Sequence, residues 1–139
     1  MIIRDARAGD TSRLAELLED LGHPIADEVL RQNLDRLTRL DLVPLVAVEG
    51  EQVVGLCALW VTHTLHRDAP LGRISTMIVA SSHRGQGIGA ALVGEAERRL
   101  QAMGCIMVEV TSNDRRKRAH AFYERLGYER TSARFSRTL

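Results

Sequence analysis

The chain has 139 residues, 45% of them hydrophobic and only 4% aromatic, and its 19 basic and 18 acidic side chains leave a net charge of +1. This balance predicts one globular domain, 1–139, with an aliphatic core, and it argues against a nucleic-acid binder, which would carry a strongly basic surface. No apolar run approaches the roughly 20 residues of a membrane span and no signal peptide is visible, so we expect a cytoplasmic protein.

The spacing of apolar residues predicts the elements in chain order. Helices are expected where leucines recur every three or four residues, and strands where short apolar runs end at polar or glycine turns. Asp10 or Thr11 is the expected cap of the first helix, and Glu49-Gly50 the turn of a hairpin. The expected order is a strand at 1–6, helices at about 11–21 and 27–40, strands at 43–48, 52–62 and 73–79, a helix at 88–103, a strand at 105–110, a helix at 117–126, and one or two strands within 128–139. This order predicts an α+β fold.

The two cysteines, Cys57 and Cys105, stand alone within apolar runs and lack the C-x-x-C spacing of a metal or redox site. They read as buried reduced thiols, and a disulfide between them stays open.

The junction after the strand at 73–79 carries the most specific pattern. The residues from Arg84 to Gly89 read RGQGIG and lead directly into a helix. Glycines leave backbone N–H groups uncovered, and a helix start adds unpaired N–H groups and the positive end of its dipole. Such a junction suits a phosphate or pyrophosphate, with Arg84 as a cation at its mouth. A P-loop is excluded because Gly89 is followed by alanines rather than Lys-Ser or Lys-Thr, and the glycine spacing does not fit a Rossmann fingerprint.

Two motifs resemble those of the GCN5-related N-acetyltransferases. Arg84 to Gly89 is similar to the family's Arg/Gln-x-x-Gly-x-Gly/Ala turn, and the stretch from Arg116 to Tyr128 is similar to its later R-x-x-A-x-x-F-Y-x-x-x-G-F/Y helix. The motifs stand in the family's order, and the resemblance covers essentially the whole chain. It implies a three-layer α/β/α fold in which about four helices flank a splayed, mostly antiparallel sheet.

The resemblance also implies acetyl-CoA as the donor and the primary amine of a small molecule as the acceptor, joined by direct attack. A main-chain amide before the turn, for which Ile78 is the candidate, would stabilise the charge that develops on the thioester oxygen. Tyr123 is the expected catalytic residue, because a hydroxyl at this motif position eases departure of the thiolate. The residues expected to bind the cofactor are Met77, Ile78, Val79, Arg84, Gly85, Gln86, Gly87, Ile88, Gly89, Ala90, Asn113 and Arg116.

The general base is missing from its usual place. Many family members carry a glutamate on the strand before the glycine turn, where this chain has Arg73, Ser75, Thr76 and Met77. The candidate substitutes are Glu109, His63 and His66. The two histidines lack a third ligand nearby, so no metal site is expected.

Within the family, the C-terminal half looks closest to aminoalkylphosphonate N-acetyltransferases. The shared features are His66, Thr111-Ser112-Asn113, Ala119-His120, Phe122-Tyr123, Gly127-Tyr128 and Arg134-Phe135-Ser136. An anionic acceptor would be bound by arginine, for which Arg73 and Arg134 are candidates. A non-catalytic acyl-CoA sensor and a peptide or protein N-acetyltransferase remain alternatives. The family is often homodimeric, and the C-terminal strands are the expected interface.

Overall fold

The computed structural model describes all 139 residues, which form two compact units, Met1–Glu109 and Val110–Leu139. The elements of the chain are β1 (Ile2–Asp5), η1 (Ala8–Asp10), α1 (Thr11–Leu21), α2 (Asp27–Arg39), β2 (Leu45–Glu49), β3 (Gln52–Thr62), β4 (Leu71–Val79), η2 (Ser81–His83), α3 (Ile88–Ala102), β5 (Val108–Val110) and α4 (Lys117–Arg125), where η denotes a 3-10 helix. This order confirms the predicted α+β class.

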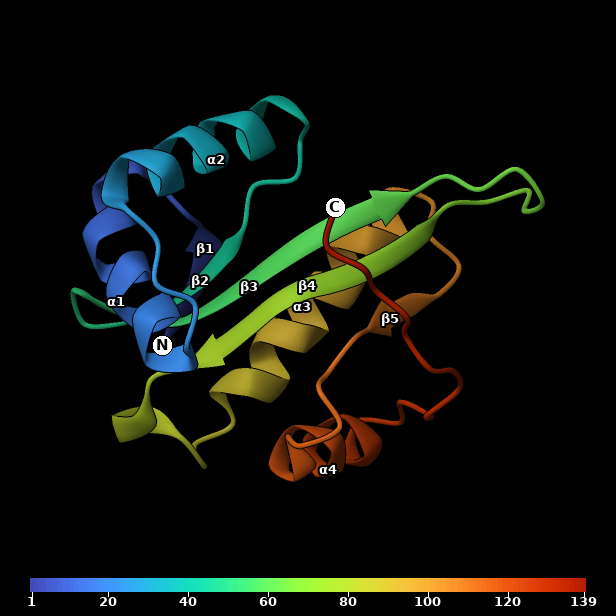
Figure 1. Cartoon of the computed structure of the whole chain (residues 1–139). Helices are drawn as coiled ribbons and strands as arrows, with labels where there is room; N and C mark the ends of the chain where they lie inside the picture. Colours follow the sequence, from blue (N-terminus) through green and yellow to red (C-terminus); the bar gives the residue numbers. More distant parts are fainter. The chain divides into compact units, whose positions relative to one another are not determined.

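One open sheet runs through the first unit in the order β1-β2-β3-β4-β5 (Figure 1). The pairs β1–β2, β2–β3 and β3–β4 are antiparallel. The bonds from the Ile106 N–H to the Pro70 carbonyl and from the Gly72 N–H to the Met107 carbonyl advance in the same direction along both segments, as in parallel pairing. The sheet is therefore mixed but mostly antiparallel, as predicted.

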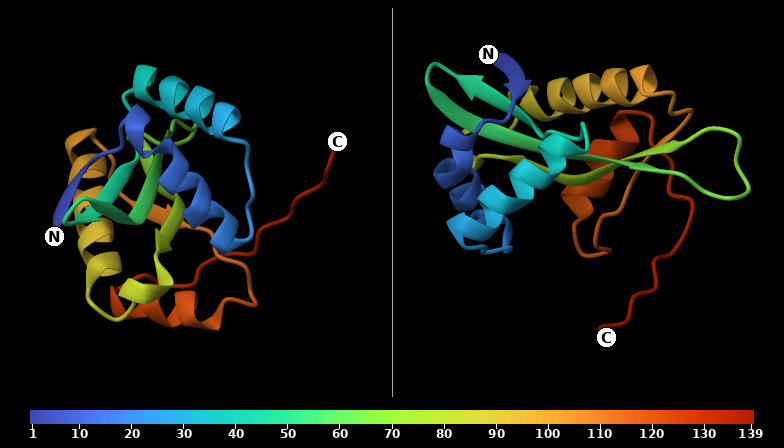
Figure 2. Two further views of the ribbon diagram at one scale, coloured as in Figure 1. Left: turned by 90° about the vertical axis from the view of Figure 1, so that its left-hand side faces the viewer. Right: turned by 90° about the horizontal axis from the view of Figure 1, so that it is seen from above.

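Helices cover both faces of this sheet, as Figure 2 shows. Helix α1 contacts β3 and β4 on one face and α2 packs against α1, while α3 contacts β2, β3 and β4 on the other face. Helix α3 comes very close to the strands at two glycines. A Cβ placed on Gly55 would lie 2.9 Å from Leu92 Cδ1, and one placed on Gly72 would lie 2.7 Å from Leu100 Cδ1. Leu92 and Leu100 are fully buried there, so the glycines allow α3 to seal the core.

Charged pairs fasten both layers of helices to β1. Arg4 of β1 donates two hydrogen bonds to the carboxylate of Asp10, over 2.8 and 3.0 Å. These bonds, together with one from the Arg7 N–H, hold the pKa of Asp10 below its ordinary value. Asp10 is the N-cap residue of α1, one of the two predicted, but its side chain binds Arg4 and the Arg7 N–H instead of capping the helix. On the opposite face, Arg99 of α3 pairs with Asp5 at the end of β1.

The second unit holds α4 and the C-terminal tail. Gly127, with φ +92°, ends the helix, and the Tyr128 N–H bonds the Tyr123 carbonyl over 3.0 Å. The one or two strands predicted within 128–139 are absent. The tail is polar at most positions and its large apolar side chains, Phe135 and Leu139, are fully exposed. It therefore lacks the buried face that would fix a strand, and the homodimer predicted on those strands remains a prediction.

Smaller differences occur elsewhere. Strand β5 begins at Val108 rather than Cys105, because Gly104 and the residues after it form the turn out of α3. Cys57 and Cys105 are both buried and both free, and burial raises the pKa of Cys57 to about 12. No helix of the chain has the length and apolar character needed to cross a bilayer.

The close approach at Gly72 gives a prediction about stability. Gly72→Ala should lower the free energy of unfolding by about 1–3 kcal/mol, because the new methyl group must displace Leu100 in a packed core. Gly94→Ala is the matched control, since a Cβ on Gly94 in α3 meets no atom within 4 Å. That substitution should raise stability by about 0.5–1 kcal/mol, the usual gain from replacing a helical glycine. Urea denaturation of the three proteins measures both effects, and equal changes in the two variants would contradict the packing argument.

Candidate functional site

The turn between β4 and α3 exposes a row of backbone amides. Gly85 and Gly87 adopt φ angles of +76° and +81°, a region that other residues rarely enter, and Gly87 is the N-cap of α3. No side chain caps the helix, and Ala91 is the first residue whose N–H bonds back, to the Gly87 carbonyl over 3.1 Å. The N–H groups from Gly85 to Ala90 therefore have no acceptor within the chain. Together with the helix dipole they form a site for an anion.

The space in front of these amides is open. A Cβ placed on Gly85 or on Gly87 would meet no atom within 4 Å. The structure thus brings together, in one continuous turn, the predicted residues from Arg84 to Ala90. Ile88 is the exception in orientation, because its side chain is buried in the core and only its backbone can face a ligand.

The β3–β4 ladder decides which amides of β4 are free. The Ala80 N–H donates to the Val54 carbonyl over 2.8 Å, and the register pairs Ile78 with Leu56. In an antiparallel pair, residues whose N–H and C=O groups face the partner strand alternate with residues whose groups face away. Two residues before Ala80, Ile78 must also face β3, whereas Met77 and Val79 direct their N–H and C=O groups outward.

The outward edge of β4 at Met77 and Val79 is not covered by β5. Strand β5 has three residues and β4 has nine, and the bonds to the segment that enters β5 lie at the other end of β4, at Pro70 and Gly72. This edge can pair with an extended ligand in the manner of an added strand. The geometry corrects our expectation for Ile78: its amide is engaged within the sheet, and the free amides are those of Met77 and Val79.

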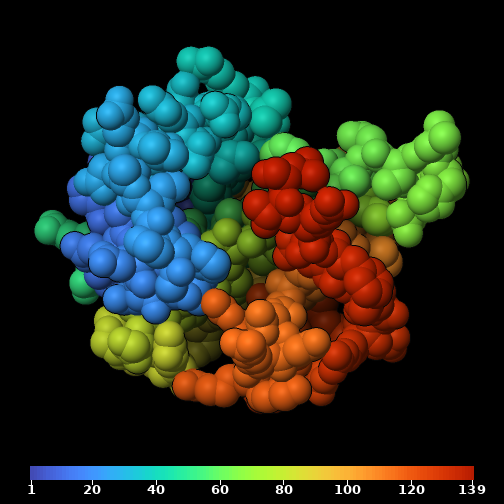
Figure 3. Space-filling view, in the orientation of Figure 1, coloured from blue at the N-terminus to red at the C-terminus, as the bar shows by residue number.

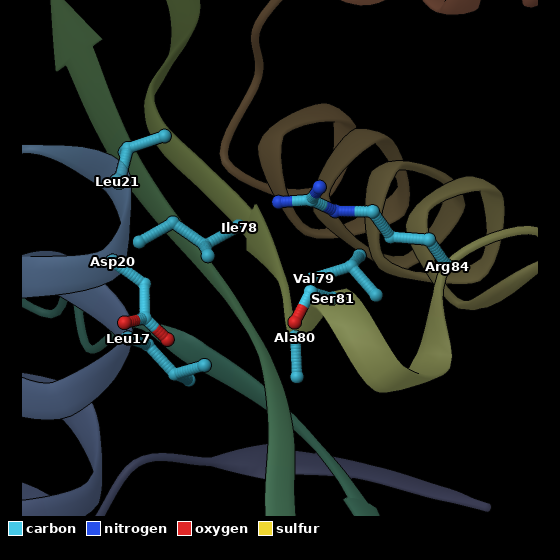
Figure 4. A pocket seen from close by; sticks show the side chains of 8 residues that line it. All are labelled: Leu17, Asp20, Leu21, Ile78, Val79, Ala80, Ser81 and Arg84. Carbon is cyan, nitrogen blue, oxygen red and sulfur yellow. The ribbon is translucent and has the colours of Figure 1, made fainter.

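A cavity of about 330 Å³ lies on the α1 side of the same strand end (Figure 4). Its lining residues are Leu17, Asp20, Leu21, Ile78, Val79, Ala80, Ser81 and Arg84. Leucines of α1 and Ile78 make one apolar wall, and the Arg84 side chain reaches back from the glycine turn on the other side. The sequence placed Leu17 and Leu21 on the apolar face of α1, but no pattern in it indicated that the end of this helix stands beside the end of β4.

Two oppositely charged side chains line the cavity without pairing. Asp20 and Arg84 are both exposed, and neither takes part in any hydrogen bond or ion pair within the chain. Asp20 is a site residue that sequence reasoning missed. It is the only acidic residue in the lining.

The remaining predicted residues belong to the second unit. Asn113 organises the entry to α4, since its Oδ1 accepts the Arg115 N–H and its carbonyl accepts the Arg116 N–H, each over 2.9 Å. Tyr123 is buried and its ring makes edge-to-face contacts with Phe122 and Tyr128, at centroid distances of 5.0 and 5.7 Å. The cofactor-binding role of Asn113 and Arg116 and the catalytic role of Tyr123 stay predictions.

None of the three candidate bases lines the cavity. Glu109 is an exposed residue of β5, and His63 and His66 are exposed on the β3–β4 connection, which projects from the sheet in light green in Figure 3. No group of three or more His, Cys, Asp or Glu side chains in the chain is arranged to hold a metal ion.

Known proteins match this chain along most of its length. The family model described as "Acetyltransferase (GNAT) family" matches residues 12–128. The aminoalkylphosphonate N-acetyltransferase of Salmonella typhimurium is 34% identical over 94 residues, and this chain covers 61% of that enzyme's length while the match takes in 68% of the chain. The glucosamine 6-phosphate N-acetyltransferase of Trypanosoma brucei brucei is 28% identical over 132 residues, which are 89% of this chain and 88% of that enzyme.

Solved structures share the fold. A transcriptional regulator from Bacillus halodurans superimposes with a TM-score of 0.91 at 25% identity and covers 99% of both chains. The aminoglycoside N-acetyltransferase AAC(6')-Iy, solved in complex with CoA, has a TM-score of 0.87 at 18% identity and covers 99% of this chain and 93% of its own.

Proposed function

The chain belongs to the acetyltransferase (GNAT) family, and we propose that it transfers an acetyl group from acetyl-CoA to the primary amine of a small molecule that also carries an anionic phosphoryl group. Its relatives with assigned activities acetylate amines. Acetyl-CoA as the donor is the family's general property, and one fold neighbour was solved with CoA bound.

The observation that carries this proposal is the continuity between the free amides of the glycine turn and the free edge of β4. CoA has a diphosphate joined to a pantetheine arm that contains two amides. The diphosphate would bind the N–H groups from Gly85 to Ala90, assisted by Arg84. The arm would then continue along Met77 and Val79, exchanging hydrogen bonds with their outward N–H and C=O groups.

This placement assigns roles in the reaction. The thioester would lie at the far end of the arm, where the Met77 N–H can donate to its carbonyl oxygen and stabilise the negative charge that develops during attack. The amine nitrogen forms the C–N bond, the C–S bond breaks, and the sulfur leaves as thiolate. A hydroxyl supplied by Tyr123 would give the thiolate its proton. Ser75, Thr76 and Met77 provide no carboxylate on this strand, so the amine's own proton must leave by another route.

The phosphoryl group of the acceptor is inferred from the relatives. The names of both relatives specify an amine that carries phosphorus as phosphonate or phosphate. Arginine suits such an anion because its planar donors can bind two oxygens at once. Arg73 of β4 and Arg134 of the tail remain the candidates.

The direct test is thiol release from acetyl-CoA against a panel of amines. We expect free thiol to form with 1-aminoalkylphosphonates or with glucosamine 6-phosphate, and to form much more slowly with uncharged amines of the same size. Turnover confined to aminoglycosides or peptide N-termini would refute the anionic acceptor. Cys57 and Cys105 are buried, so the native protein's own thiols should contribute little background to a thiol reagent.

Glycine substitutions test the grip on the diphosphate. Gly87→Ala should raise the Kd for CoA at least ~10-fold, because relief of its positive φ would turn the neighbouring N–H groups away from the phosphates. Gly50→Ala is the control, since Gly50 also has positive φ and open space but belongs to the β2–β3 hairpin. Both should lose about 1–2 kcal/mol of stability, and only Gly87→Ala should lose affinity in calorimetry. Equal CoA affinity in the two variants would count against the glycine turn as the phosphate site.

Removing one hydroxyl tests the assigned acid. Tyr123→Phe keeps the ring contacts with Phe122 and Tyr128, so the fold should survive. We expect kcat to fall roughly 10²-fold or more, the range for loss of a general acid, with the Kd for CoA unchanged. A variant with wild-type kcat would remove Tyr123 from the mechanism.

A second function is favoured by one comparison. The Bacillus halodurans structure is described as a transcriptional regulator, although it shares the fold along its whole length. Together with the missing carboxylate on β4, this keeps open a module that binds acyl-CoA without turning it over. Tight CoA binding combined with no thiol release across the amine panel would establish that alternative.

A further inference from the structure

We propose that Asp20, at the end of α1, binds the ammonium group of the acceptor in the cavity beside β4. This inference rests on the proposed function, because it assigns the binding site of the acceptor amine in the same reaction. It adds a residue that lies outside both sequence motifs and that no pattern in the sequence pointed to.

The first argument is the composition of the cavity. Asp20 is the only carboxylate in a lining that is otherwise made of leucine, isoleucine, valine, alanine and serine residues and one arginine. Leu17 and Leu21 flank it on the same face of α1, one turn before and one residue after, and Ile78 faces them from β4. Asp20 is exposed at this cavity, so its carboxylate is accessible to a cation that binds there.

The second argument is that no group of the chain neutralises the charge of Asp20. Asp20 has no hydrogen-bond or ion-pair partner within the chain, so its carboxylate is available to a ligand. Arg84 lines the same cavity and does not bridge to Asp20. A cavity with one free cation and one free anion fits a pair of ligand groups of opposite sign.

The third argument is position along β4. Asp20 lines the cavity with Ile78, and the residues on either side of Ile78 carry the outward amides that would hold the pantetheine arm. An ammonium held by Asp20 would therefore lie beside the stretch of β4 along which the arm is proposed to run. Asp20 is the one carboxylate in the lining of this cavity, and β4 itself carries none.

The experiment compares an amine with its hydroxyl isostere. We would measure binding of 1-aminoethylphosphonate and 1-hydroxyethylphosphonate to the protein saturated with CoA, by calorimetry, for the wild type, Asp20→Asn and Glu19→Gln. Asp20→Asn removes the charge and keeps the shape. Glu19→Gln removes a neighbouring exposed carboxylate that does not line the cavity. Neither side chain holds the fold together, so both variants should fold.

We expect the wild type and Glu19→Gln to prefer the amine by roughly 10- to 100-fold, the usual worth of a charge-assisted hydrogen bond, and Asp20→Asn to lose that preference. The affinity of all three proteins for CoA should be equal. The proposal would be overturned if Asp20→Asn kept the preference for the amine, or if the wild type showed no preference or did not bind the amine. It would also be overturned if Asp20→Asn lost affinity for CoA as well as for the amine. Absence of thiol release with normal discrimination between the two phosphonates would instead defeat only the proposed enzymatic function.

Discussion

The structure depends on how tightly α3 packs against the sheet. Gly55 and Gly72 leave no room for a side chain, so Leu92 and Leu100 press directly onto β3 and β4. This fixes the start of α3 beside the end of β4, with only the turn from Ala80 to Gly87 between them. The N–H groups of that turn have no acceptor within the chain, and a Cβ placed on Gly85 or Gly87 would meet no atom within 4 Å. A packing constraint in the core thus preorganises a polar site at the surface.

A bulge between β3 and β4 changes the side of the sheet on which the side chains at the end of β4 lie. The register shifts between Ala58 and Leu59, so that Thr76 and Ile74 pair with consecutive residues of β3. Ile74 lies two residues from Gly72, on the α3 face, and is almost fully buried. Ile78 lies four residues further on and would share that face in a regular strand, yet it lines the α1 cavity. The extra residue therefore turns the end of β4 toward α1, where the cavity forms.

Sequence reasoning succeeded where a local pattern has one physical meaning. The hairpin at Glu49-Gly50, the glycine turn and the capping of α3 follow from backbone conformations that glycine alone adopts readily. It failed where the outcome depends on distant partners. The tail within 128–139 has strand-compatible residues but no apolar face to bury. The register between β3 and β4 determines which alternate residues of β4 bond to β3, and it places the Ile78 amide among them. Asp20 is an ordinary helical acid until the fold sets it beside β4.

The proposed grip on the cofactor uses main-chain groups almost entirely, and the proposed hold on the acceptor uses side chains. Main-chain amides survive any substitution that preserves the turn, and solved structures with this fold are as little as 18% to 25% identical to the chain. A side chain such as Asp20 or Arg73 could be replaced without altering those main-chain contacts. Similarity to known proteins therefore identifies the family, whereas the acceptor would be selected, in the proposed complex, by the few side chains that face β4 from α1 and by those of the strand itself.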